Sequence, residues 1–137
     1  MSSPPRSSPA RSLALAFGVA TFVFLLLDSA WLTTMASRVY RPAIGHLMAD
    51  DVDVVGALAF YAVYLSGIVG FAVRGAADAR TALVRGAALG FVCYGTYDLT
   101  NQATLAGWPW HLTVLDLAWG SFVTGVSAWS AHRAALR

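Results

Sequence analysis

Four stretches of the sequence are apolar and long enough to cross a lipid bilayer. They cover residues 13–34, 54–73, 81–105 and 111–131. A spanning helix needs about 20 mostly apolar residues, because hydrocarbon offers no hydrogen-bond partner to exposed backbone groups. The composition agrees, since the chain is 58% hydrophobic and 12% charged and has a mean hydropathy of +0.62. The sequence therefore predicts an all-α fold, a four-helix transmembrane bundle.

The regions outside these stretches are short. Residues 1–12, rich in Ser and Pro, predict a disordered N-terminal tail, residues 13–131 a single membrane domain, and residues 132–137 a C-terminal tail. A basic start before an apolar run also resembles a cleavable signal peptide. Asp28 and Trp31 instead favour a helix that the protein retains.

The arginines predict an orientation. Two of the nine basic residues, Arg38 and Arg41, lie between the first two stretches, and the other seven flank the opposite ends: Arg6, Arg11, Arg74, Arg80, Arg85, Arg133 and Arg137. The positive-inside rule then places both termini in the cytoplasm. We expect a multi-pass protein of the bacterial inner (cytoplasmic) membrane, with the lipid bilayer as its partner. The net charge of +2 is too small and scattered to indicate a nucleic-acid partner.

Three carboxyl groups fall at a similar predicted depth. With a rise of about 1.5 Å per residue, Asp28, Asp98 and Asp116 lie roughly 8 to 11 Å below the outer boundary. Asp98 and Asn101 share one helical stripe with two tyrosines, Tyr94 and Tyr97, at helical spacing. The predicted intramembrane polar site is one layer that consists of Asp28, Asp98, Asn101, Asp116, Tyr61, Tyr64 and Tyr97.

Four further residues form a candidate rim: His46, His111, Trp31 and Trp119. Packing or an interfacial position is the simpler interpretation of each, although either histidine could complete a metal site beside the carboxylates. The sequence identifies no catalytic residue, cofactor or metal. A small-xxx-small pair, Gly86 and Gly90, predicts a close helix contact.

Several motifs are similar to those of a known family. They are D-x-A-W-L from Asp28, G-H-L-M-A at 45–49, F-Y-x-x-Y at 60–64, T-Y-D-L-T-N-x-A-T-L-x-G-W-P at 96–109 and T-x-x-D-x-x-W-G at 113–120. The chain resembles, from Leu13 to about Ala131, the bacterial membrane protein family catalogued as domain of unknown function 2177. The resemblance implies a small four-helix inner-membrane protein and supplies no activity.

The carboxylates leave three functions open. Inserting an Asp at the centre of a membrane helix costs about 2.5–3.5 kcal/mol of free energy on insertion scales. Three such residues in one small protein are therefore expected to have a role. They could bind or transport a proton, a cation or a small polar solute, which with only four helices would require a homo-oligomer. They could instead fasten the helices of a structural or accessory subunit. A third reading is an outer-leaflet enzyme with paired carboxylates, so enzymatic activity is uncertain.

Overall fold

The structure is a computed structural model that describes residues 8–136. The described residues form helices and no strand. The long elements are α1 (Pro9–Met35), α3 (Val54–Gly67) with its continuation η3 (Ile68–Val73), α4 (Ala79–Thr104) and α5 (Trp110–Ala135). Between α1 and α3 lie the short elements η1 (Ala36–Tyr40), α2 (Arg41–Ile44) and η2 (Gly45–Leu47). The all-α, four-helix prediction is confirmed.

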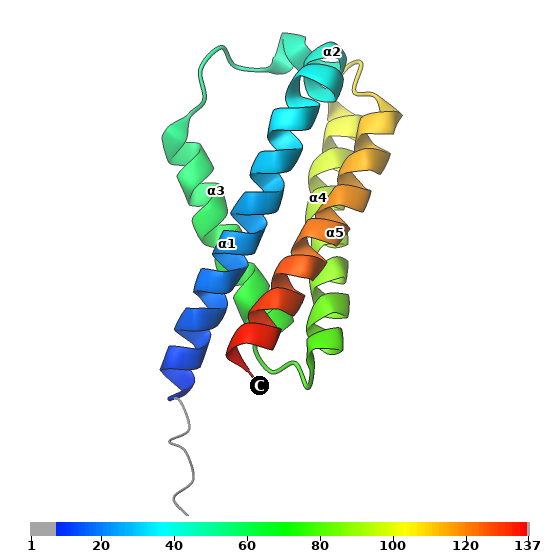
Figure 1. The fold of residues 1–137 in the computed structure, drawn as a ribbon. Helices are drawn as coiled ribbons and strands as arrows, with labels where there is room; N and C mark the ends of the chain where they lie inside the picture. Colours follow the sequence, from blue (N-terminus) through cyan, green and yellow to red (C-terminus); the bar gives the residue numbers. More distant parts are fainter. Residues whose placement is uncertain (1–7, 137) are drawn as a thin grey trace, which may run out of the picture.

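The two ends of the bundle are easily told apart. The start of α1 and the end of α5 lie at one end, here called the terminal end, and α2 lies with the α4–α5 turn at the other, the α2 end (Figure 1). Helix α1 begins earlier than predicted, because Ser8 caps it and accepts a hydrogen bond from the Arg11 N–H at 3.4 Å. The predicted disordered tail is therefore wrong for residues 9–12, and its residues 1–7 lie outside the described part.

The other helix limits agree with the sequence to within a few residues. Helix α5 runs to Ala135, so residues 132–135 of the predicted C-terminal tail are helical. Residue 137 lies outside the described part. By length and composition, two helical stretches could cross a membrane, Pro9–Leu47 and Val54–Val73. Helices α4 and α5 are long enough, at 26 residues each, but less apolar: α4 carries Arg80 and Arg85, and α5 carries most of the buried polar side chains.

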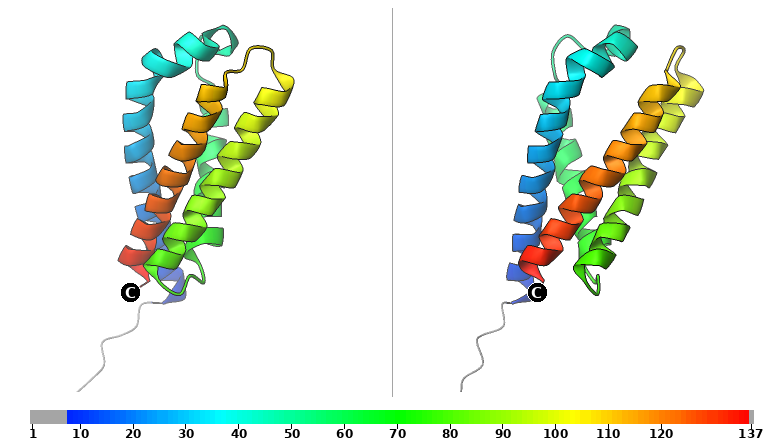
Figure 2. Two further views of the ribbon diagram at one scale, coloured as in Figure 1. Left: turned by 90° about the vertical axis from the view of Figure 1, so that its right-hand side faces the viewer. Right: turned by 45° about the vertical axis from the view of Figure 1, so that its right-hand side comes forward.

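Helix α5 lies between α1 and α4 and packs closely against α4 (Figure 2). The close approach requires glycine. A Cβ atom at Gly90 would lie 2.0 Å from the carbonyl oxygen of Gly120, and one at Gly86 would lie 2.8 Å from the carbonyl oxygen of Thr124. The contact predicted from the Gly86 and Gly90 pair is therefore present, and its partner is α5.

The hydrophobic core lies towards the terminal end. Its largest fully buried side chains come from three elements: Phe24 of α1, Ile68 and Val73 of η3, and Val123 of α5. The Phe24 ring meets Tyr64 edge to face at 5.5 Å. Towards the α2 end the buried side chains are increasingly polar. One half of the bundle is thus an apolar core, and the other half holds the carboxyl groups.

The first part of α3 stands away from its neighbours. Asp53 caps it by accepting a hydrogen bond from the Gly56 N–H at 3.0 Å. Along this part Val55 and Val63 are 77% and 75% exposed. In Figure 1 this part of α3 diverges from α4 towards the α2 end, whereas η3 packs against both α4 and α5. A helix with apolar side chains exposed on several sides suits surroundings of hydrocarbon.

Polar contacts secure the loop between η3 and α4 at the terminal end. A ring nitrogen of the buried His132 lies 3.1 Å from the carbonyl oxygen of Ala76. Asp78 caps α4, where the Thr81 N–H donates to its Oδ1 at 2.7 Å. This backbone hydrogen bond lowers the pKa of the Asp78 carboxyl below its ordinary value. The ionised cap therefore stabilises the folded state.

The glycine contact leads to a stability prediction. The variant Gly90→Ala forces α4 and α5 apart, because the new Cβ meets backbone rather than a flexible side chain. We expect it to lower the free energy of unfolding by about 1–3 kcal/mol or more. The control is Gly18→Ala on α1, whose Cβ meets no atom within 4 Å, so it should be neutral or stabilising by up to about 1 kcal/mol. Equal values for the two variants in a denaturant titration in micelles would contradict close packing.

The Asp78 cap leads to a pH prediction. Because the folded-state pKa of Asp78 is lowered, its contribution is present above the ordinary Asp value and is lost as the pH falls through the folded value. The loss of melting temperature in Asp78→Ala should therefore be greatest near neutral pH and disappear as the pH falls below the folded value. The control Asp51→Ala removes an exposed loop carboxyl and should show no such trend. A constant difference for Asp78→Ala would exclude an ionised cap.

Candidate functional site

A chain of hydrogen bonds joins α1, η1 and α5 towards the α2 end. The indole Nε1–H of Trp31 donates to the Tyr40 hydroxyl at 2.9 Å, and the Tyr40 hydroxyl donates to Oδ1 of Asp116. Asp116 is buried and Tyr40 half-buried. The π-helical turn η1 positions Tyr40, since it bends the chain over the end of the bundle directly after α1. Tyr40 is therefore a direct hydrogen-bond donor to Asp116.

A second, separate contact holds Asp28. The Tyr61 hydroxyl of α3 donates to its Oδ2 at 2.8 Å. The rings of Trp31 and Trp119 stack with centroids 4.3 Å apart and planes 8° from parallel. Trp31 follows Asp28 on α1, and Trp119 follows Asp116 on the oppositely directed α5. Because the stacked tryptophans lie at one level and the helices run in opposite directions, the two carboxyl groups are offset by roughly 9 Å along the bundle.

Asp98 is the exceptional member of the site. It is fully buried, and neither carboxyl oxygen has a hydrogen-bond partner among the described residues. It interacts electrostatically with the Asp116 carboxyl on α5, which lies within reach of a hydrogen bond if either carboxyl group is protonated. The indole Nε1–H of Trp119 is also buried without a partner in the described part of the chain. Unsatisfied buried polar atoms are rare and often mark the place of a bound proton, water, ion or ligand.

The other predicted site residues lie around these groups. The Tyr64 hydroxyl is 2.7 Å from Thr124 Oγ1 and so ties α3 to α5. Asn101 is half-buried near the end of α4. Tyr97 is 60% exposed and packs edge to face against Trp108 at 6.1 Å. The structure thus gathers Asp28, Asp98, Asp116, Tyr61 and Tyr64 inside the bundle, and it leaves Tyr97 at the surface.

The predicted rim divides in the same way. Trp31 and Trp119 belong to the interior through their stack, whereas His46 and His111 are exposed. His111 and Arg38 line a depression of about 240 Å³ at the α2 end. Within residues 8–136 no three His, Cys, Asp or Glu side chains are grouped so as to hold a metal ion. The histidine-assisted metal site therefore gains no support from the described residues.

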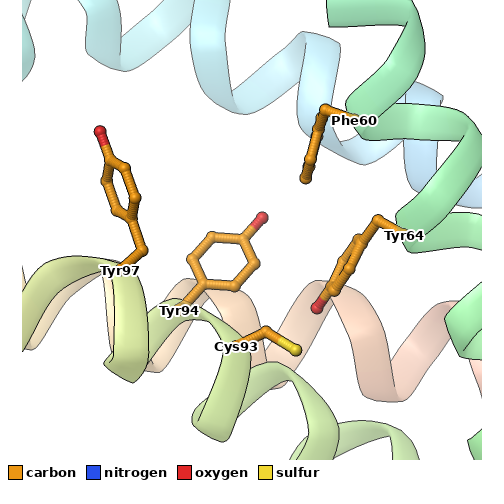
Figure 3. A pocket seen from close by; sticks show the side chains of 5 residues that line it. All are labelled: Phe60, Tyr64, Cys93, Tyr94 and Tyr97. Carbon is orange, nitrogen blue, oxygen red and sulfur yellow. The ribbon is translucent and has the colours of Figure 1, made fainter. Parts of the chain in front are cut away.

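A groove opens beside the carboxyl groups, between α3 and α4. It has a volume of about 380 Å³ and is lined by Phe60, Tyr64, Cys93, Tyr94 and Tyr97. Figure 3 shows the Tyr94 ring at its centre, with the Tyr94 hydroxyl directed into the space between the two helices. The Tyr94 ring lies against Gly120 of α5, where a Cβ would come within 2.2 Å of Cγ of that ring.

Sequence reasoning missed two residues of this site. Tyr94 carried a signal, because it belongs to the same helical stripe as Asp98. Tyr40 carried almost none, because it ends the π-helical turn η1, which changes the number of residues per turn, so the 3.6-residue periodicity no longer gives its direction. Tyr40 donates a hydrogen bond to Asp116, and both Asp28 and Asp116 act on Tyr94 electrostatically.

The fold and the site define an α-helical membrane protein with buried carboxyl groups. The family described as "Predicted membrane protein (DUF2177)" matches residues 13–132. The chain belongs to this family, as the sequence motifs indicate. No curated protein and no solved structure matches the chain significantly.

The Tyr40 contact leads to a prediction for the site. The variant Tyr40→Phe keeps the ring but leaves Asp116 Oδ1 and the Trp31 indole without their partner. We expect the free energy of unfolding to fall by about 1–3 kcal/mol. Tyr97→Phe is the matched control, since Tyr97 is 60% exposed and its hydroxyl makes no hydrogen bond within residues 8–136. If the two variants unfold alike in micelles, the Tyr40 hydrogen bonds contribute nothing.

Proposed function

We propose that this protein crosses the cytoplasmic membrane four times and binds a proton between Asp98 and Asp116, through which it moves a proton or a small polar solute. The arginines support an arrangement with both termini in the cytoplasm and the α2 end outside. In that arrangement the exposed Arg38 and Arg41 lie on the outer side. The lipid bilayer is then the surroundings of all four helices.

The unpartnered Asp98 carboxyl carries the proposal. A carboxylate without a hydrogen bond is costly in a low-dielectric interior, and a second carboxylate beside it adds repulsion. Neighbouring buried carboxyl groups relieve both costs when they share one proton. Arg38 and Arg41, the arginines of the α2 end, are exposed and so do not neutralise this pair. A proton is therefore the simplest species that the Asp98–Asp116 pair could hold.

Hydroxyl groups on both sides of the Asp98–Asp116 pair support a route by which a proton could reach and leave it. The Tyr40 hydroxyl, half-buried at the α2 end, can both accept and donate a proton, and it already donates to Asp116. On the other side the buried Thr124 hydroxyl meets Tyr64, and the Ser127 hydroxyl lies one turn further along α5. These groups continue the polar face of α5 towards the terminal end.

Infrared spectroscopy tests the bound proton directly. The full chain in lipid nanodiscs should show the carbonyl stretch of a protonated carboxyl group at neutral pH. Asp98→Asn and Asp116→Asn should each remove it, because either change separates the pair. Asp51→Asn, which alters an exposed loop carboxyl, should leave the band in place. A spectrum without this band, or one in which neither variant changes it, would exclude the shared proton.

Vesicles test the transport. In liposomes that contain a pH-sensitive dye, an imposed potential should drive a protein-dependent pH change that Asp98→Asn abolishes and Asp51→Asn retains. If the infrared band is present but the chain moves no proton under a potential or a solute gradient, the site binds a proton for another purpose.

A structural role is the second candidate, and two contacts favour it. The Tyr40–Asp116 and Tyr61–Asp28 hydrogen bonds link three parts of the bundle, and such contacts contribute about 0.6–2 kcal/mol each in membranes. The free energy of unfolding separates the two candidates. Asp28→Asn should lower it modestly, while Asp98→Asn should leave it unchanged or raise it, because an amide can still bond to Asp116 and the repulsion between two buried carboxyl groups is removed. A large loss for Asp98→Asn would favour the structural role.

A further inference from the structure

We propose that the groove between α3 and α4 binds a single-chain amphiphile from the membrane, whose hydrocarbon chain lies along the aromatic wall and whose hydroxyl group meets the hydroxyl of Tyr94. This inference concerns a separate cavity and does not depend on proton binding by Asp98 and Asp116.

The position of the groove indicates whether its ligand comes from the lipid or from water. It lies between two helices of a membrane protein, on the side where α3 diverges from α4 (Figure 1). The side chains around it are apolar and exposed, among them Val63 at 75% and Val92 at 60%. Such a surface faces hydrocarbon rather than water. A molecule that enters the groove therefore comes from the lipid phase.

The lining decides what kind of molecule fits. The groove of about 380 Å³ has walls of aromatic rings, with Phe60 and Tyr64 nearly parallel at 5.6 Å. Its volume is within the usual range of ligand pockets, which begins near 300 Å³. These walls offer flat apolar faces and few polar atoms. They suit one hydrocarbon chain and offer no charged group to compensate a charged headgroup.

The tyrosine hydroxyls of the groove indicate where the polar group of the ligand would bind. The hydroxyl of Tyr64 is occupied by Thr124, and that of Tyr97 points away from the centre (Figure 3). The Tyr94 hydroxyl points into the groove and makes no hydrogen bond with any group in residues 8–136. Beyond it lie the carboxyl groups of Asp28 and Asp116, which act on Tyr94 electrostatically. An uncharged hydroxyl suits this place, because a phosphate would meet two acidic groups.

Photolabelling tests the proposal on the full chain in lipid nanodiscs. The probe is hexadecanol with a diazirine in its chain, and mass spectrometry locates the adducts. We expect adducts on the groove residues from α3 and α4, and competition by unlabelled hexadecanol. The same diazirine on hexadecane, which lacks the hydroxyl, should label these positions less. Tyr94→Phe should weaken hexadecanol competition roughly two- to tenfold, as for one lost hydrogen bond, and Tyr97→Phe should not.

A pair of adjacent variants supplies the control for access. Cys93→Trp places a large side chain on the groove wall, whereas Val92→Trp places the same side chain on the lipid-facing surface next to it. Labelling of the groove should be lost only in Cys93→Trp. Melting temperatures of both variants show that the bundle is intact, and if Cys93→Trp fails to fold, Cys93→Leu replaces it.

Two results would overturn the proposal. One is labelling spread evenly over the lipid-facing surface and insensitive to hexadecanol and to Cys93→Trp, since this is the pattern of surrounding lipid. The other is an unlabelled groove in a particle whose mass, from light scattering, is that of two chains, since a second copy would then cover α3. Loss of the carboxyl band in Asp98→Asn with unchanged labelling would separate this site from the proton site.

Discussion

The contact between the backbones of α4 and α5 is the constraint on which the rest of the structure depends. Gly90 and Gly120 leave no space for a Cβ atom between the two helices. Because the helices run in opposite directions, Asp98, two turns beyond Gly90, then lies about one turn further towards the α2 end than Asp116, one turn before Gly120, and the two carboxyl groups interact. The same contact presses the Tyr94 ring onto α5 and so fixes one wall of the groove. A wider helix spacing would separate the carboxyl groups and let Tyr94 move.

The two halves of the bundle have different physical roles. The half at the terminal end is packed with Phe24, Ile68 and Val123, and this apolar core holds the helices in place. The half at the α2 end buries carboxyl groups, two of which receive tyrosine hydrogen bonds while Asp98 receives none from residues 8–136. A stable core allows such an unfavourable group to persist, because the helices cannot separate to expose it. Buried polar groups of this kind are retained where they serve a function.

The divergence of α3 connects the site with the membrane. Its continuation η3 is packed among α4 and α5, yet its first part exposes Val55 and Val63 and leaves an opening beside Tyr94. Exposure of this apolar surface would be unfavourable in water, whereas in hydrocarbon it carries no free-energy penalty. Tyr94 is the link between the two sites, because its ring lines the groove and its hydroxyl lies within the field of Asp28 and Asp116.

The sequence by itself determined the four long helices, since about 20 apolar residues in a row have few other solutions. It also determined the stripe of Tyr94, Asp98 and Asn101 and the close contact at Gly90, because both follow from helical periodicity. Only the tertiary structure decided that Asp98 meets Asp116 while Asp28 lies deeper with Tyr61, and that Tyr40 folds back over Asp116. Periodicity fixes the face of a helix, but the offset between helices depends on packing that no single segment contains.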